Sequence, residues 1–130
     1  MRIISIFLFS IVSIFANADV ADLKMQSAGK YVPVKIQEYN GLKLTRDCFK
    51  SKIPKCDAFV ATTKKTLISK SKIPLAGHPA ARLCLDRDGL NRIVKDKDNK
   101  QYDYCLFKDG SMIDAWNLYY LTYSKTTIEK

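Results

Sequence analysis

The sequence predicts a small α+β domain held together by disulfides, with a β-hairpin and basic segment at residues 19–72 and a helix–β-hairpin–helix module at residues 73–130. Three observations predict this class. The chain has an even number of cysteines, four in all. Alternating apolar residues flank turn signals, and apolar residues at helical spacing start and stop at capping residues. A length of 130 residues suits one small domain better than two large ones.

Residues 1–18 have the pattern of a secretory signal peptide. Basic Arg2 precedes an unbroken run of apolar and small polar residues at 3–15, and Ala16-Asn17-Ala18 supplies small residues before a cleavage site. The run is shorter than the roughly 20 residues that span a bilayer as a helix. We therefore expect an exported protein, periplasmic or secreted, which begins at Asp19 and is not an integral membrane protein after signal removal.

All four cysteines lie in the part that would be exported: Cys48, Cys56, Cys84 and Cys105. In an oxidising compartment an even count most often means disulfides, and four cysteines allow three pairings. A zinc site would need closer cysteine pairs or more histidines than the single His78. Cys84 with His78 has the residue types of a nucleophilic pair, but export favours structural disulfides.

The positive charge is concentrated in one stretch of the chain. The whole sequence has 22 basic and 13 acidic residues, and residues 41–72 hold nine of the basic and two of the acidic ones. Such a stretch attracts anionic partners through a salt-dependent field, although lysines scattered over an ordinary surface explain it as well. The lysines expected to contact an anionic surface are Lys50, Lys52, Lys55, Lys64 and Lys65. No aromatic residues alternate with them, and export also argues against nucleic acid as a partner.

A β-hairpin is predicted around Asn40-Gly41. Its apolar residues alternate on both sides of the turn: Val32, Val34 and Ile36 before it, Leu42 and Leu44 after it. A two-residue loop would oppose Ile36 to Thr45 and put the two apolar sets on opposite faces. Since a hairpin with one buried face needs both sets on the same side, we predict a three-residue, bulged turn that opposes Ile36 to Leu44.

Between the hairpin and the module, Asp57 can cap a helix. The residues that would share its apolar face are Phe59, Val60, Thr63, Leu67 and Ile68. Residues 69–77 contain Pro74 and Gly77 and are predicted to form a connector.

The last third of the chain predicts helix, hairpin and helix. His78 is a candidate helix cap, Pro79 suits the first helical position, and Gly89 stops the helix with a residue free to take a positive φ. Residues 90–95 and 101–107 predict two strands. After a turn at Gly110, Ser111 and Asp114 resemble a capping box for the second helix. In that helix we expect Trp116 to anchor the core, with Pro79, Gly89 and Gly110 as the other structural anchors.

Residues 77 to about 120 resemble the bacterial domain of unknown function 333, whose members often carry a hemolysin label. The residues that carry the resemblance are Gly77-His78-Pro79-Ala80-Ala81, Cys84, Gly89, Ile93, Gln101-Tyr102, Cys105, Asp109-Gly110-Ser111 and Trp116. The resemblance covers about a third of the chain. It implies an exported or lipid-anchored protein and no established biochemical role.

The departures from the family pattern imply a disulfide pairing. Family members have Asn in place of His78 and glycines in place of Asn99 and Lys100. They also have two more cysteines, at the positions of Ile113 and Tyr123. The loss of both together implies that these two cysteines normally bridge each other. By this resemblance Cys84 pairs with Cys105, and Cys48 pairs with Cys56.

Nothing in the sequence predicts an enzyme, a metal or another cofactor. A nucleophile elbow and a phosphate-binding glycine loop are both missing. Residues 96–99 look like the start of a Ca²⁺ loop, but Gln101 and Phe107 replace the glycine and glutamate that such a loop requires. We expect a solvated hairpin tip there.

Three functional hypotheses follow. The first is an exported binding module of unknown ligand that docks on a protein partner, in one version as an inhibitor, through the hairpin and the tyrosines at 119, 120 and 123. The alternative is a cationic, hemolysin-like protein that binds a membrane or another anionic envelope surface. The third is a small hydrolase.

Overall fold

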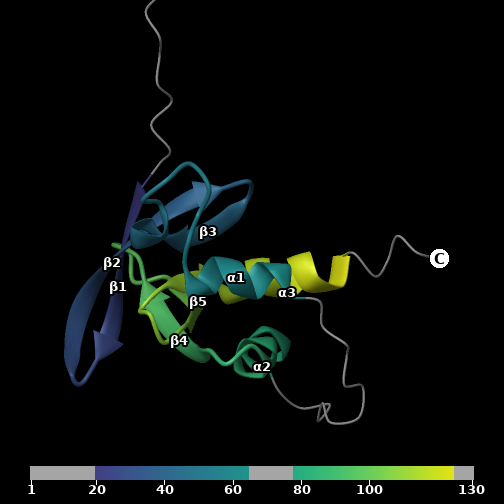
Figure 1. The fold of residues 1–130 in the computed structure, drawn as a ribbon. Helices are drawn as coiled ribbons and strands as arrows, with labels where there is room; N and C mark the ends of the chain where they lie inside the picture. The colour runs from purple at the N-terminus through teal and green to yellow at the C-terminus, as the bar shows by residue number, and fades with distance from the viewer. Residues whose placement is uncertain (1–19, 65–77, 125–130) are drawn as a thin grey trace, which may run out of the picture.

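The computed structural model describes residues 20–64 and 78–124 and shows a closed, six-stranded antiparallel barrel (Figure 1). Its strands run in the order β1-β2-β3-β6-β5-β4, and β1 pairs with β4 to close it. The strands are β1 (Val20–Ser27), β2 (Lys30–Tyr39), β3 (Leu42–Thr45), β4 (Leu90–Lys95), β5 (Gln101–Leu106) and β6 (Met112–Asp114). The helices are the short 3-10 helix η1 (Arg46–Cys48), α1 (Asp57–Thr63), α2 (Pro79–Asp86) and α3 (Ala115–Ser124).

The expected α+β helix–hairpin–helix module is therefore wrong, since most of the fold is one sheet. Strands from both sides of the expected boundary at residues 72 and 73 join in it: β3 pairs with β6, and β1 pairs with β4. The sequence did carry a signal for β1, because Ala21, Leu23 and Met25 alternate with polar residues.

The β2–β3 hairpin has the register that the sequence analysis rejected. Ile36 lies opposite Thr45 and Tyr39 opposite Leu42, so the loop is the two residues Asn40 and Gly41, both with positive φ. The expected bulged turn assumed that only one face of the hairpin is buried. In the barrel Val34 and Ile36 of β2 are buried in the interior, while Leu44 of β3 is buried on the outer side, so the two apolar sets point to opposite faces.

These two sides form two separate cores. Inside the barrel lie Leu23, Val34, Ile36, Val94, Tyr104 and Met112. Outside it, the helices pack on the wall and bury Leu44, Cys48, Ala58, Ala61, Leu83, Cys84, Cys105, Phe107, Ile113 and Leu118. Figure 1 shows the helices gathered on one side of the barrel, while the β1–β2 hairpin projects on the other.

Helix α1 is capped by a distant turn rather than by its own first residue. The N-cap residue is Cys56, whose side chain makes no capping bond, so the expected cap by Asp57 is wrong. Instead the Asp57 N–H donates to Asp109 Oδ2 at 2.8 Å and the Ala58 N–H donates to Ser111 Oγ at 2.9 Å. The β5–β6 turn thus supplies the first acceptors of α1. Leu67 and Ile68, expected on this helix, lie outside the described residues.

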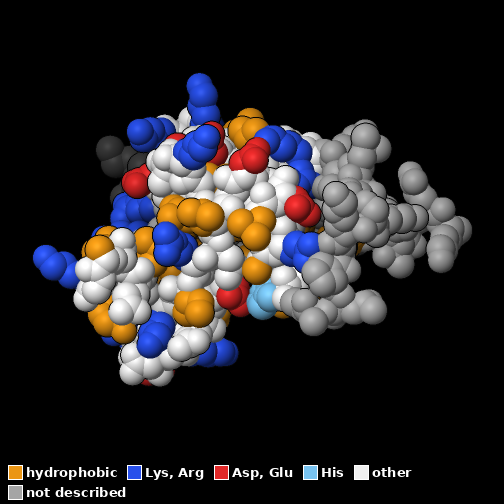
Figure 2. All heavy atoms as spheres, turned by 90° about the horizontal axis from the view of Figure 1, so that it is seen from below, with side chains coloured by type: hydrophobic (Ala, Val, Ile, Leu, Met, Phe, Trp, Pro, Cys, Tyr) orange, Lys and Arg blue, Asp and Glu red, His pale blue; other side chains and the backbone are white. Residues whose placement is uncertain are grey.

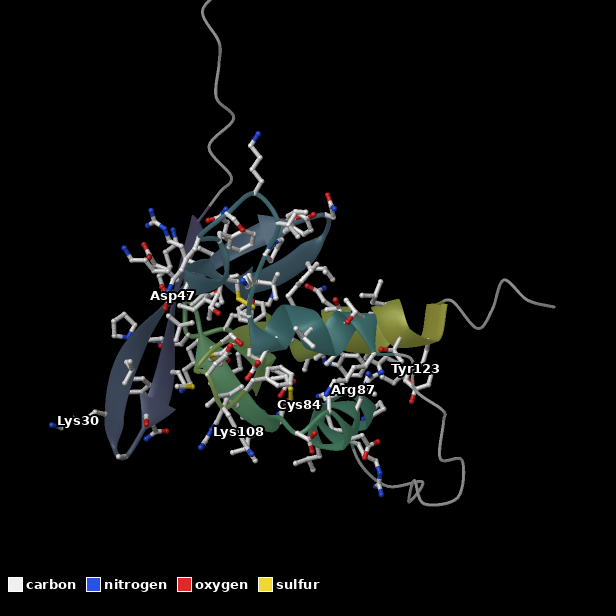
Figure 3. The ribbon with its side chains drawn as sticks, in the orientation of Figure 1. Lys30, Asp47, Cys84, Arg87, Lys108 and Tyr123 are labelled. Atoms are coloured by element: carbon white, nitrogen blue, oxygen red, sulfur yellow. A yellow bond between two sulfur atoms is a disulfide. The ribbon has the colours of Figure 1, made fainter. Side chains whose placement is uncertain are left out.

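The opposite end of α1 is held by Arg87, which follows α2. Its buried guanidinium donates from Nη1 to the Lys64 carbonyl at 2.8 Å. A cation at a helix C-terminus stabilises the last carbonyl groups. Figure 3 shows Arg87 among the helices, near Cys84 and Tyr123.

Helix α3 begins later than predicted. Met112–Asp114 is strand β6, so Ser111 and Asp114 do not form a capping box. Asp114 alone is the cap: its Oδ1 accepts from the N–H groups of Trp116 and Asn117 at 2.9 and 3.0 Å. Within the described ranges, none of the helices is long and apolar enough to cross a membrane.

Candidate binding surfaces

Both disulfides implied by the family resemblance are present. Cys48 is bonded to Cys56 and Cys84 to Cys105, with Cα–Cα distances of 5.2 and 5.6 Å. The first closes the loop before α1, and the second ties α2 to the barrel wall at β5. Such bridges are typical of oxidising, extracellular or periplasmic compartments.

Aromatic side chains of α3 form one contiguous group. The Trp116 ring stacks on Tyr120 with centroids 5.7 Å apart, and Tyr119 lies 4.6 Å from Tyr123. Tyr119 also contacts Trp116 and Tyr120, at 5.5 and 5.6 Å. The Tyr120 side chain is 61% exposed. Together with His78, whose ring lies 4.8 Å from Trp116, we call these five residues the α3 aromatic surface.

Trp116 is therefore not the core anchor that the sequence analysis expected. It is half-buried, and the fully buried residues of this helix are Ala115 and Leu118. The apolar spacing of Trp116 was correct for a helix, but the periodicity did not show which face meets the barrel.

His78 occupies the polar edge of the α3 aromatic surface, and both its ring nitrogens are engaged. As predicted, it caps α2: Nδ1 accepts from the Ala81 N–H at 3.0 Å. The neutral ring therefore carries its proton on Nε2, which lies 2.9 Å from Asp103 Oδ2. Asp103 also accepts from Asn91 at 3.1 Å. The histidine is visible at the surface in Figure 2.

The scaffold holds the α3 aromatic surface rigidly. Asp114 fixes the first turn of α3, and Leu118 is packed in the outer core. Asn117 accepts a hydrogen bond from the Lys43 N–H at 3.0 Å, which links α3 to β3. The positions of the rings are thus set by the barrel and not by a flexible loop.

The second surface is the loop closed by Cys48 and Cys56. Its three lysines, Lys50, Lys52 and Lys55, are all exposed, and so is Ile53, at 64%. We call these four residues the lysine loop. Lys64 is also exposed but lies at the C-terminal end of α1, outside this loop. Lys65 lies outside the described residues.

The tip of the β4–β5 hairpin is a self-contained turn, as expected. Asp96 Oδ1 accepts from the N–H groups of Asp98 and Lys100, and Oδ2 accepts from the Tyr102 hydroxyl at 3.0 Å. Desolvation alone would raise the pKa of Asp96, but these hydrogen bonds lower it below its usual value. Within residues 20–64 and 78–124, no group of three or more His, Cys, Asp or Glu side chains could hold a metal ion.

The three remaining anchors have different roles. Pro79 is at the start of α2, and Gly110 has a φ of +85° in the β5–β6 turn, as a glycine turn requires. Gly89 does not have the expected positive φ, because Asp88 before it takes that conformation, with φ of +64°. The glycine is needed for space instead, since it lies against the Cys84–Cys105 disulfide.

Tyr102 and Tyr104 were not predicted from the sequence to line a cavity. Both line a hollow at one end of the barrel. Their alternation along β5 was the available signal, but only barrel closure brings β1 and β2 around them.

The fold and its surfaces define a small, disulfide-bonded β-barrel protein. Residues 76–120 match the family described as Domain of unknown function (DUF333). The match runs from α2 through β4, β5 and β6 into α3, and it leaves β1 to β3 and the lysine loop outside. Comparison with curated proteins and with solved structures gives no match.

Proposed function

We propose that the protein is an exported binding module that docks on a protein partner through the α3 aromatic surface. The observation that carries this proposal is the set of four aromatic rings on one helix, in mutual contact, with Tyr120 largely exposed. Aromatic residues are enriched in protein interfaces, where they provide large contact areas and most hot spots.

The rigid support of these rings favours binding. A surface that is already ordered loses little side-chain and backbone entropy when a partner docks. Here Asp114 caps the helix and Asn117 links it to β3. The same rigidity would suit an inhibitor-like partner contact, in which a fixed surface fills an active-site cleft.

Export is part of the proposal. Two disulfides support an oxidising destination, and residues 1–18 have the composition of a signal peptide. A binding role also accounts for His78 better than catalysis does. A general base needs a free lone pair near the substrate, whereas the lone pair of Nδ1 is used to cap α2.

Capture from periplasmic extract by the mature chain tests the proposal. The bait variants are Tyr120→Ala and, as the matched control, Tyr31→Ala. Tyr31 is similarly exposed, at 54%, and follows Lys30 on β2. Figure 3 shows Lys30 and Tyr123 on opposite sides of the molecule. The captured partner is then purified, and its affinity is measured for each variant.

We expect Tyr120→Ala to weaken the partner's affinity at least about tenfold, as truncation of an aromatic hot spot does, while Tyr31→Ala changes little. Equal affinities for the two variants would overturn the proposal.

One observation favours a second candidate function, binding to an anionic membrane or envelope surface. The lysine loop combines three exposed lysines with an exposed apolar side chain, Ile53. Near an anionic lipid surface each lysine contributes about 1 kcal/mol, and an apolar residue beside them can enter the interface.

Vesicles of mixed anionic and neutral lipids test this candidate. Changing Lys50, Lys52 and Lys55 to Gln should abolish binding, whereas the same change at Lys30, Lys35 and Lys108 should weaken it only slightly. The binding should also fall steeply between low and physiological salt, since the Debye length shrinks to about 8 Å. Vesicle binding that changes neither with the lysine-loop substitutions nor with salt concentration would exclude this function.

A further inference from the structure

A cavity of about 560 Å³ opens at the end of the barrel where β1 begins and β2 ends. Its walls are mostly apolar and include Leu23 and Ile36 from the inner core. The rings of Tyr102 and Tyr104 line it from β5. Its volume is within the range of about 300–1,000 Å³ that is usual for small-molecule sites.

Tyr104 is the unusual residue of this cavity. It is only 2% exposed, and its side chain points into the barrel with Val94 and Met112. Its hydroxyl makes no hydrogen bond to any residue in the two described ranges, although Tyr102 next to it on the same face bonds to Asp96. A hydroxyl without a partner in the protein can donate a hydrogen bond to a molecule that enters the cavity.

The Tyr104 hydroxyl remains a donor at all physiological pH values. Burial raises its pKa well above the ordinary value of 10, and the nearby Asp114 carboxylate raises it further. A ligand in this cavity would therefore meet one fixed hydrogen-bond donor between apolar and aromatic walls.

The charged groups at the cavity do not select an ion. Asp22 and Asp96 are balanced by Lys43 and Lys97. The Asp96 carboxylate is also bound on both oxygens by the hairpin tip and by Tyr102. A net charge on the ligand would thus gain little here and would lose hydration.

From this geometry we propose that the barrel end binds a small, neutral, ring-containing molecule that has a carbonyl or hydroxyl oxygen. The ring packs against Tyr102, Leu23 and Ile36, and the oxygen accepts a hydrogen bond from Tyr104. This site lies at the open end of the barrel, whereas the α3 aromatic surface lies on a helix outside the barrel, so the two inferences are independent.

The test uses the mature chain and prodan, a neutral naphthalene ketone whose fluorescence reports both burial and hydrogen bonding at its carbonyl. Titrations are run with the wild type, with Tyr104→Phe, and with Ala21→Phe, which narrows the opening at an exposed position of β1. Tyr31→Phe, on the exposed part of β2, is the matched control. Thermal melts establish that each variant is folded.

We expect saturable binding by the wild type and by Tyr31→Phe. Tyr104→Phe should weaken binding about two- to tenfold, the effect of one hydrogen bond, and should shift the probe emission to that of a carbonyl without a donor. Ala21→Phe should abolish binding. Naphthoate, the anionic counterpart, should bind more weakly than prodan.

Three results would overturn the proposal: no saturable binding of prodan, binding that neither Tyr104→Phe nor Ala21→Phe changes, or tighter binding of naphthoate. Loss of the prodan signal in Tyr120→Ala would likewise overturn it, since the probe would then be on the α3 aromatic surface.

Discussion

Gly89 lies so close to the Cys84–Cys105 disulfide that a Cβ on it would be 2.3 Å from Cys105 Sγ. The same Cβ would also be 3.0 Å from Cys84 Sγ and 3.2 Å from the Cys84 carbonyl oxygen. Since Gly89 has no positive φ, this position requires glycine for its size and not for its backbone freedom. The chain passes directly over the bridge that joins α2 to β5.

Gly89→Ala should therefore destabilise the oxidised protein by about 1–3 kcal/mol, the range found for overpacked cores. Urea denaturation without reductant measures this change. The matched test places the same substitution in a Cys84→Ala, Cys105→Ala background, where the two sulfur atoms are gone. In that background Gly89→Ala should lower the free energy of unfolding by less than half as much as it does in the oxidised wild type. Equal losses in the two backgrounds would show that the disulfide is not the cause.

Asp109 should stabilise the protein above about pH 4 and lose this effect in acid. Desolvation by itself would raise the pKa of Asp109, but hydrogen bonds from Asp57 and Ser111 lower it below its usual value of 3.8. A folded pKa below the unfolded one means that the contribution is complete above the unfolded pKa and disappears as the pH falls through the folded pKa.

Asp109→Asn should accordingly cost about 0.5–2 kcal/mol at pH 7, as the loss of a helix cap does. The difference between the two proteins in free energy of unfolding should disappear as the pH falls below about 4, because the Asp109 carboxylate of the wild type then becomes protonated. Denaturation curves from pH 7 to pH 2 measure both values. A constant difference down to pH 2 would contradict the capping role of the carboxylate.

Trp116 and Leu118 should differ in their effect on stability. Because Trp116 is half-buried, Trp116→Ala should cost about 1–2 kcal/mol, whereas Leu118→Ala, at a fully buried position, should cost about 2–5 kcal/mol. The melting temperatures of the two variants show which substitution destabilises the protein more. If Trp116→Ala were the more damaging, Trp116 would be a core residue and less of the α3 aromatic surface would be available to a partner.

If residues 1–18 are removed on export, the protein recovered from the producing cells should contain no free thiols and should start at Asp19. Mass spectrometry before and after alkylation, with and without reductant, tests both expectations. A native Cys84 that reacts with the alkylating reagent would contradict the bridge to Cys105 and would restore the cysteine nucleophile hypothesis.

Local features were largely predictable from the sequence. The Asn40-Gly41 turn, the strands around residues 96–100 and the His78 cap of α2 were each identified from a few neighbouring residues. The disulfide pairing came from the family resemblance, since cysteine spacing alone leaves three possibilities.

Barrel closure was not predictable in the same way, because it depends on pairs of residues far apart in the chain. β1 meets β4 through Met25 and Val94, and β3 meets β6 through Leu44 and Ile113. Without these pairs only one face of the β2–β3 hairpin was expected to be buried, which gave the wrong register. The caps of α1 by Asp109 and Ser111 were missed for the same reason.

We propose that the α3 aromatic surface, and not the lysine loop, contacts the natural partner. The most direct test measures the affinity of the captured partner at low and physiological salt for three proteins: wild type, Tyr120→Ala, and the variant with Lys50, Lys52 and Lys55 changed to Gln. We expect Tyr120→Ala to weaken binding at least about tenfold at both salt concentrations and the lysine changes to alter it little. The proposal would be contradicted if Tyr120→Ala kept its affinity for the partner while physiological salt and the lysine changes each abolished binding.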